Sequence, residues 1–279
     1  MKDNVIVASV QMNPKWMDAK ENIRKMKDAI SQARHDQNAD IVIFPELNNI
    51  GYIKERNKIF GRDYYKHAEK IPGDFTNAIS EYAKKFSVYV ITGMAERHPS
   101  IPGMLYNSAI LISPKGTIEG IHRKVHIPGE EKHYFYPANE IKVMETEIGN
   151  IGIAICYDNQ FPELTRTLAL QGCEILCMLF NMPSFSNSPK LLYYYTAARA
   201  AENRMYAISC NRIGKEDETI FLGHSAIADP IGNLIATAES EDTILYGNLS
   251  NDRLLEERAQ QPVFRDRRPD VYGELVKPL

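Results

Sequence analysis

The chain has 279 residues, of which 44% are hydrophobic and 25% are charged, and its formal net charge is −3. This composition is typical of a globular protein long enough for one large domain, and the slightly acidic balance gives no electrostatic case for binding nucleic acid or an anionic membrane. The longest apolar runs are no longer than a strand, so we expect no membrane span.

Strand-like and helix-like patterns alternate along the chain. The apolar stretches that predict strands are 5–11, 41–44, 88–94, 106–113, 117–124, 142–146, 151–156, 174–178, 206–210, 225–228, 233–237 and 243–249. The stretches that predict helices are 19–34, 76–86, 161–171, 189–203 and 251–261. Turn residues at 114–116 and 230–232 predict hairpins. This order predicts an α/β fold with mixed sheets, without deciding between one sheet and two.

Cys156 occupies the most informative position in the sequence. It closes the apolar run 151–156, and Pro162 shortly afterwards suits the first turn of a helix. A thiol at such a strand-to-helix turn points out of the sheet, and helix N–H groups nearby would stabilise a thiolate. A buried, unreactive cysteine is the commoner case, and this is our interpretation of Cys173, Cys177 and Cys210.

Two charged residues also follow strand-like runs. Glu46 comes directly after 41–44 and a proline, where apolar neighbours would raise its pKa and make it a base. Lys124 ends the run 117–124, and two glutamates follow in the next loop, Glu130 and Glu131. Each of these residues alone is equally compatible with a solvated loop.

Together these segments resemble the nitrilase, or carbon–nitrogen hydrolase, superfamily. The resemblance extends from residue 5 to about residue 247, and its motifs occur in the family's order. They are Phe44-Pro-Glu46, His122-Arg-Lys124 with His126, Cys156-Tyr-Asp158 with Phe161-Pro-Glu163, 199–203, and Asn211-Arg212.

The resemblance implies a fold and a set of catalytic roles. The fold is a four-layer α-β-β-α sandwich, with two mixed β-sheets packed face to face and helices outside. Glu46 would be the general base, Lys124 the group that stabilises the tetrahedral intermediate, and Cys156 the nucleophile. The family's second glutamate precedes a proline by six positions, which favours Glu131, before Pro137, over Glu130. No metal or organic cofactor is needed.

Further residues near these strand ends are candidates for contacts with the substrate, although each alone more often serves packing. They are Tyr52, Tyr157, Asn159, Asn181 and Met182, with Asn48, Tyr134 and Phe185 as weaker candidates. The spacing of His122 and His126 would suit a metal only on a helix, and this stretch is not helical.

The residue two positions after Cys156 bears on the substrate. Asp158 stands where nitrilases of the family usually have glutamate, so the resemblance favours a small amide or an N-carbamoyl amine over a nitrile. The stretch 211–215 resembles N-carbamoyl-amine hydrolases, and 181–183 and 222–225 resemble N-carbamoyl-D-amino-acid hydrolases. In the latter, two arginines hold a carboxylate where this chain has Asn159 and Gln160. This difference argues against an α-carboxylate substrate.

The sequence predicts one hydrolase domain over residues 1–262 and an extended tail over 263–279. Such tails cross onto a second subunit in the family, so we expect a homodimer or a larger homo-oligomer; a disordered end is the alternative. Free cysteines and a start without an export signal predict a cytoplasmic location. A regulatory binding module of the same fold is the non-enzymatic alternative, against which the retention of Glu46, Lys124 and Cys156 argues.

Overall fold

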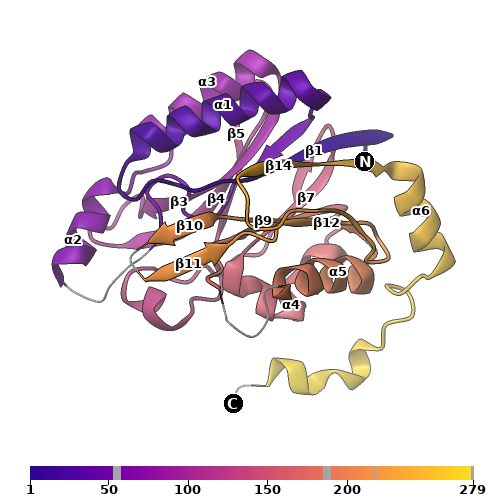
Figure 1. Cartoon of the computed structure of the whole chain (residues 1–279). Coiled ribbons are helices and arrows are strands. Elements are labelled where there is room, and N and C mark those ends of the chain that lie inside the picture. Colours follow the sequence, from indigo (N-terminus) through magenta and orange to yellow (C-terminus); the bar gives the residue numbers. More distant parts are fainter. Residues whose placement is uncertain (53–57, 185–189, 217, 278–279) are drawn as a thin grey trace.

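A computed structural model describes residues 1–52, 58–184, 190–216 and 218–277 (Figure 1). Within these ranges, two six-stranded sheets lie face to face. The first sheet has the order β14-β1-β2-β3-β4-β5, with β1 Asn4–Gln11, β2 Ile41–Ile43, β3 Tyr89–Arg97, β4 Leu105–Ile112, β5 Ile118–Arg123 and β14 Thr243–Ser250. The second has the order β13-β12-β9-β8-β7-β6, with β6 Met144–Thr146, β7 Gly149–Ile155, β8 Ile175–Phe180, β9 Tyr206–Asn211, β12 Ala226–Ala228 and β13 Leu234–Thr237.

Both sheets are mixed. In the first, β1 pairs in parallel with β2 and β2 with β3, while the outer pairs are antiparallel. In the second, β7, β8 and β9 are parallel and their outer neighbours run the other way. The carboxyl ends of the parallel strands therefore lie side by side at the same end of each sheet. Ligands commonly bind beyond these strand ends in sheets of this kind.

The helices are α1 Ala19–Gln37, α2 Lys58–His67, α3 Asp74–Phe86, α4 Pro162–Leu170, α5 Leu191–Asn203 and α6 Asn251–Gln260. Four of them cover the outer faces of the sheets, and α2 and α6 lie at opposite ends of the sandwich (Figure 1). Helices α1 and α3 pack on the first sheet and α4 and α5 on the second. The α1 helix begins after Asp18, whose side chain accepts a hydrogen bond from the N–H of Glu21 and so satisfies one free donor.

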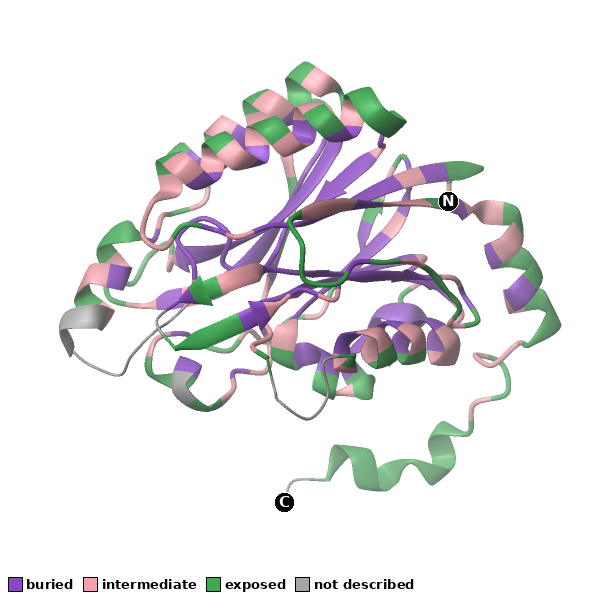
Figure 2. Ribbon diagram, viewed as in Figure 1, coloured by how far each residue is buried: buried purple, intermediate pink, exposed green. Residues whose placement is uncertain are grey.

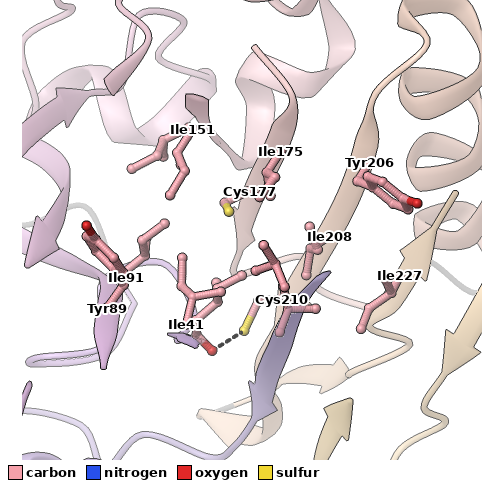
Figure 3. Packing of buried hydrophobic residues seen from close by; sticks show 14 of the residues in the cluster. Ile41, Tyr89, Ile91, Ile151, Ile175, Cys177, Tyr206, Ile208, Cys210 and Ile227 are labelled. Carbon is pink, nitrogen blue, oxygen red and sulfur yellow. Dashed lines mark hydrogen bonds between the residues drawn. The ribbon is translucent and has the colours of Figure 1, made fainter. Parts of the chain in front are cut away.

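The largest apolar core lies between the two sheets (Figure 3). Ile41 and Ile91 from the first sheet and Ile175 and Ile208 from the second are fully buried there. Because strands buried on both faces cannot alternate with polar residues, the runs 41–44 and 175–180 are apolar throughout. The predicted α-β-β-α sandwich is confirmed, and the structure resolves the choice between one sheet and two.

Two elements were absent from the sequence prediction. One is α2, a ten-residue helix that contains Gly61, a residue unfavourable inside a helix. The other is a short hairpin of β10 Ile213–Glu216 and β11 Thr219–Leu222, which stands outside both main sheets. Four-residue strands are too short for a clear alternating pattern.

The C-terminal segment from residue 263 runs along the outside of the domain, and its residues are mostly exposed (Figure 2). It was predicted to be extended, but it contains two short 3-10 helices, Pro269–Val271 and Gly273–Val276. The exposed apolar side chains Val271, Leu275 and Val276 lie in this segment. None of the helices in the described ranges is long and apolar enough to cross a membrane.

Candidate active site

The candidate catalytic residues each follow the end of a strand in one of the two main sheets. Glu46 comes after β2, Lys124 after β5, Cys156 after β7 and Asn181 after β8. The first two belong to one sheet and the last two to the other. The site is thus assembled where the ends of the two sheets meet, and the sandwich itself brings the residues together.

Lys124 lies between two buried carboxylates. Its Nζ is 2.8 Å from Glu46 Oε1 and 3.0 and 2.9 Å from the two carboxylate oxygens of Glu131. All three side chains are fully buried or nearly so. The sequence predicted these residues as a group, and the structure brings them into direct contact.

Two further side chains hold this cluster in place. The amide of Asn107, on β4, donates to Glu46 Oε1 at 2.7 Å and to Glu131 Oε2 at 3.4 Å. The hydroxyl of Tyr52 donates to Glu131 Oε1 at 2.8 Å. These hydrogen bonds fix the directions of the two carboxylates.

The cluster changes the proton affinity of its members. Burial raises the pKa of Glu46 above its ordinary value; Lys124 opposes this shift and Glu131 reinforces it. Burial alone would lower the pKa of Lys124, but the charges of Glu131 and Glu46 raise it well above its usual range. Lys124 therefore stays cationic, and Glu46 is a stronger base than a solvated glutamate.

Cys156 begins a short 3-10 helix, η2 Cys156–Gln160, directly after β7. Its φ of +46° lies in the left-handed region, which is strained for a residue with a Cβ. The residue is partly exposed, whereas Cys173, Cys177 and Cys210 are buried. A strained, accessible turn at a strand end is typical of an active-site residue.

The expectation of a stabilised thiolate is wrong. Burial raises the pKa of the Cys156 thiol well above its ordinary value, Glu46 adds to the shift, and Lys124 only partly opposes it. Helix α4 begins at Pro162, six positions after Cys156. Cys156 is therefore a neutral thiol in the resting protein and needs a base.

Glu46 is the group placed to act as that base, because its backbone and side chain are both fixed. Its second carboxylate oxygen accepts the N–H of Asn181 at 2.7 Å, and its carbonyl accepts the Asn181 amide at 2.9 Å. Gly93, on the neighbouring β3, packs directly against it: a Cβ at Gly93 would lie 2.5 Å from Glu46 Cα and 2.6 Å from Leu47 N.

Asp158 connects the Cys156 turn with the Lys124 segment. Its carboxylate accepts the N–H groups of Ile155, Val125 and His126, and contacts the rings of His126 and His122 at 3.0 and 3.2 Å. Burial alone would raise the pKa of Asp158, but the hydrogen bonds from the two histidines lower it well below its usual range. The sequence prediction gave Asp158 no structural role, and missed Asn107 as well.

The predicted substrate-contact residues divide into two groups. Tyr52 touches Glu131, and the Asn181 N–H faces both Glu46 and Cys156. Tyr157 is exposed and packs edge-on against Phe161 at 5.3 Å. By contrast, Asn159 is fully buried and its amide donates to the carbonyl of Cys156 at 3.1 Å, so it supports the turn from within.

The remaining candidates are placed less directly. Met182 is partly buried against the second sheet's outer core, and its N–H donates to Asn211 Oδ1 at 3.0 Å. Asn48 is buried and Tyr134 packs near Tyr64. Phe185 and the side chain of Glu130 lie outside the described residues. Glu131 fits the role of second glutamate through its contacts with Lys124.

A second buried ion pair lies close to Tyr52. Arg212 is fully buried; it pairs with Glu216 at 2.5 Å, donates to Asn13 at 3.0 Å, and stacks on the ring of Phe221 at 4.3 Å. Glu216 also accepts the N–H of Tyr52 at 3.3 Å. Arg212 thus has a structural partner and is not available to a substrate carboxylate.

The side chains at the site do not form a recognisable metal centre. Across the described ranges, no group of three or more histidine, cysteine, aspartate or glutamate side chains has a geometry that could hold a metal ion. His122 and His126 both turn toward Asp158.

Comparison with known proteins gives a consistent result. The carbon-nitrogen hydrolase family model matches residues 6–256. A probable nitrilase of Schizosaccharomyces pombe is 32% identical and covers all of both chains, and the human omega-amidase NIT2 is 32% identical over 92% of this chain and 94% of its own. The crystal structure of a carbon-nitrogen hydrolase from Helicobacter pylori G27 superposes with a TM-score of 0.89 at 27% identity, covering 98% of this chain and 99% of the other. Nit3 of Saccharomyces cerevisiae, a member of the nitrilase superfamily, superposes with a TM-score of 0.86 at 25% identity, covering 95% and 97%.

The family match covers every strand end that carries a candidate catalytic residue. The chain therefore belongs to the carbon–nitrogen hydrolase family of the nitrilase superfamily, and it is an enzyme of that class.

Proposed function

We propose that this enzyme hydrolyses the C–N bond of a small linear amide or N-carbamoyl amine through a thioester on Cys156. One observation carries the proposal. A permanently charged Lys124 contacts Glu46 and Glu131 at 2.8–3.0 Å, and its charge and that of Glu46 both act on the Cys156 thiol. A base, a fixed cation and a nucleophile are the three parts that acyl transfer requires.

The acylation step follows from these positions. Glu46 removes the proton of the neutral thiol as the sulfur attacks the carbonyl carbon. The resulting oxyanion is stabilised by Lys124 and by the backbone N–H of Tyr157. One such donor typically contributes about 3–4 kcal/mol in the transition state.

The proton on Glu46 then passes to the departing nitrogen, which leaves as ammonia or an amine. The C–N bond breaks and a thioester remains on Cys156. In the second half of the reaction, Glu46 takes a proton from a water molecule that attacks the thioester. The acid is released and the thiol regains its proton, so one water is consumed per bond cleaved.

The substrate class is inferred from charge. In the described cluster, two carboxylates face one cation, and Arg212 is already paired with Glu216. No arginine follows Asp158, where Asn159 and Gln160 stand. This setting favours an amide without an α-carboxylate; relatives named omega-amidase support an amide, and relatives named nitrilase keep a nitrile as the alternative.

The alternatives are a nitrile, an N-carbamoyl amino acid, and a regulatory module without turnover. Asp158 discriminates among them only indirectly, because its carboxylate is buried and occupied by five donors. Its identity acts through the geometry of the Cys156 turn.

A matched panel tests the proposal. Propionamide, propionitrile, N-propylurea and N-carbamoylglycine are compared by ammonia release, with Cys156→Ala as the negative control. We expect turnover of propionamide or N-propylurea and a covalent acyl adduct on Cys156 by mass spectrometry. A clear preference for propionitrile or N-carbamoylglycine would overturn the substrate class; absence of any adduct and of turnover would favour the regulatory module.

We further propose that the tail from residue 263 contributes to a homodimer or larger homo-oligomer. The support is its exposed apolar residues, Val271, Leu275 and Val276, which lie beyond Phe264, where the segment packs on the domain. Light scattering on the full chain should give at least a dimer, and Val271→Asp/Leu275→Asp should shift it toward monomer. A monomeric full chain would contradict this.

A further inference from the structure

Asp158 stands between the two halves of the catalytic machinery. We propose that it is a positioning residue that fixes Lys124 relative to Cys156. The proposal rests on the proposed function for its effect on turnover, but its geometric basis is independent of it.

The carboxylate of Asp158 is bonded from two directions. From the nucleophile's own strand, the N–H of Ile155 donates to Oδ2 at 3.1 Å. From the segment that carries Lys124, the N–H groups of Val125 and His126 donate to Oδ1 at 3.2 and 2.8 Å. These bonds connect the end of β7 in one sheet with the end of β5 in the other.

The rings of two histidines complete the arrangement. His122 Nε2 lies 3.2 Å from Oδ2 and His126 Nδ1 lies 3.0 Å from Oδ1. His126 also stacks on Phe161 with centroids 3.8 Å apart, which fixes the plane of its ring. His122 and His126 flank Lys124 in the sequence. Asp158 therefore contacts the segment that carries Lys124 on both sides of the lysine.

The charge on Asp158 accounts for the strength of this connection. The side chain is fully buried, and its hydrogen bonds lower its pKa well below the usual range, so it is ionised at neutral pH. Hydrogen bonds to a buried charge are roughly twice as strong as neutral ones. An acceptor-only group is also required, because every partner that it faces is a donor or can be one.

Precise placement of Lys124 matters because its charge stabilises the oxyanion directly, besides lowering the pKa of the Cys156 thiol. Its distance from the attacked carbon depends on the relative position of two sheets. A misplacement of about 1 Å at a catalytic group can cost on the order of 10²-fold in rate. The Cys156 turn also uses Asp158, through the N–H of Ile155, but it has further supports that the Lys124 segment lacks: Asn159 donates to the Cys156 carbonyl and Asn181 faces the thiol.

This difference provides a specific test. In Asp158→Asn the amide NH₂ faces donors, so the Lys124 segment loses its anchor. We expect single-turnover acylation by propionamide to fall about 10²-fold with KM changed little. Disulfide exchange of Cys156 with methyl methanethiosulfonate forms no oxyanion, so Lys124 acts on it only through the pKa of the thiol, and its rate should fall much less than acylation, by less than about tenfold.

Matched histidine variants separate the hydrogen bond from packing. His126→Phe keeps the stack on Phe161 but removes the donor, and we expect it to lower acylation about tenfold. His126→Asn returns an N–H near the position of Nδ1 and should recover part of the loss. His67→Gln, on the exposed surface of α2, is the control and should match the wild type.

NMR spectroscopy tests the hydrogen bonds between Asp158 and the two histidines directly, and it does so even if the protein turns over no substrate. In ¹⁵N NMR of Cys156→Ala protein at pH 8, His126 should carry its proton on Nδ1 and His122 on Nε2, and Asp158→Asn should change both signals. A proton on Nε2 of His126 would overturn the proposal. So would equal losses of acylation and disulfide exchange in Asp158→Asn, or unchanged acylation. If no substrate of the panel is turned over, the proposed function fails while the NMR result still decides the role of Asp158.

Discussion

Two buried clusters of charged side chains both contact Tyr52, one through its hydroxyl and the other through its backbone N–H, and they differ in charge balance. In one, among the residues that the structure describes, Arg212 pairs with the carboxylate of Glu216, and an aromatic ring covers the guanidinium. In the other, Lys124 meets two carboxylates beside a thiol. Burying charge is costly, and a one-to-one pair minimises that cost. The unbalanced cluster keeps a proton acceptor in excess, which a scaffold does not need and a catalyst does.

The largest predicted effect comes from removing one reacting group of the unbalanced cluster. Cys156→Ala and Lys124→Ala should each lower ammonia release by at least about 10³-fold. Lys124→Ala should also lower the melting temperature, because two buried carboxylates lose their cation. Cys156→Ala should melt like the wild type. Normal turnover in Cys156→Ala would mean that the nucleophile is another residue.

The second prediction asks which adjacent glutamate belongs to the cluster. Glu131→Gln removes a charge in contact with Lys124, so kcat should fall about 10²-fold. Glu130→Gln is the matched control and should retain most of the activity. The reverse result would assign the role to Glu130.

The balanced pair should respond in stability more than in turnover. Arg212→Met leaves Glu216 buried without its cation and should lower the free energy of unfolding by about 3 kcal/mol. Arg212→Met/Glu216→Leu should recover much of this, as measured by urea unfolding. If the double variant is no more stable than Arg212→Met, the loss of stability does not come from an unpaired Glu216, and the purely structural role of the pair is contradicted.

The pH dependence should reflect the excess carboxylate. Glu46 must be ionised to accept a proton, and its pKa is raised, so kcat/KM should fall tenfold per pH unit below a midpoint above 4.5. The midpoint belongs to the cluster, because its groups titrate together. Because the thiol pKa is also raised, activity should not depend on a free thiolate up to about pH 9. An acid limb at or below pH 4.5 would exclude Glu46 as a base with a raised pKa.

The smallest effect is expected for a cysteine outside both clusters. Cys173 is buried and donates weakly to the carbonyl of Ile175. Cys173→Ala should cost about 1 kcal/mol in unfolding free energy and leave turnover near normal. Loss of activity in Cys173→Ala would show that the packing between α4 and the second sheet affects the geometry of the catalytic residues.

The sequence contained enough to predict the fold and the reacting groups. Apolar runs predict strands at 41–44 and 151–156, and Glu46 and Cys156 stand at the ends of these strands. The order of the motifs along the chain is that of the family, which predicts that the two residues act in one site. The sequence did not contain the supporting contacts. Asn107 is an ordinary strand residue in the sequence, and only the pairing of β4 with its neighbours brings it to Glu46.

The prediction of a thiolate failed for a related reason. A short helix after Cys156 was visible in the sequence, but the burial of the thiol and the proximity of Glu46 arise from the second sheet packing on the first. Likewise Asn159 was read as facing substrate because it follows the nucleophile, and the tight turn directs it inward. Long-range packing decided both outcomes.

The contact between Gly93 and Glu46 has a practical consequence for engineering this enzyme. A single methyl group at Gly93 would push the neighbouring backbone and displace the base, although Gly93 carries no reactive atom itself. Libraries that aim to change substrate preference should therefore leave this position untouched. Conversely, Gly93→Ala offers a way to make an inactive protein that keeps every reacting side chain, useful as a blank in binding studies.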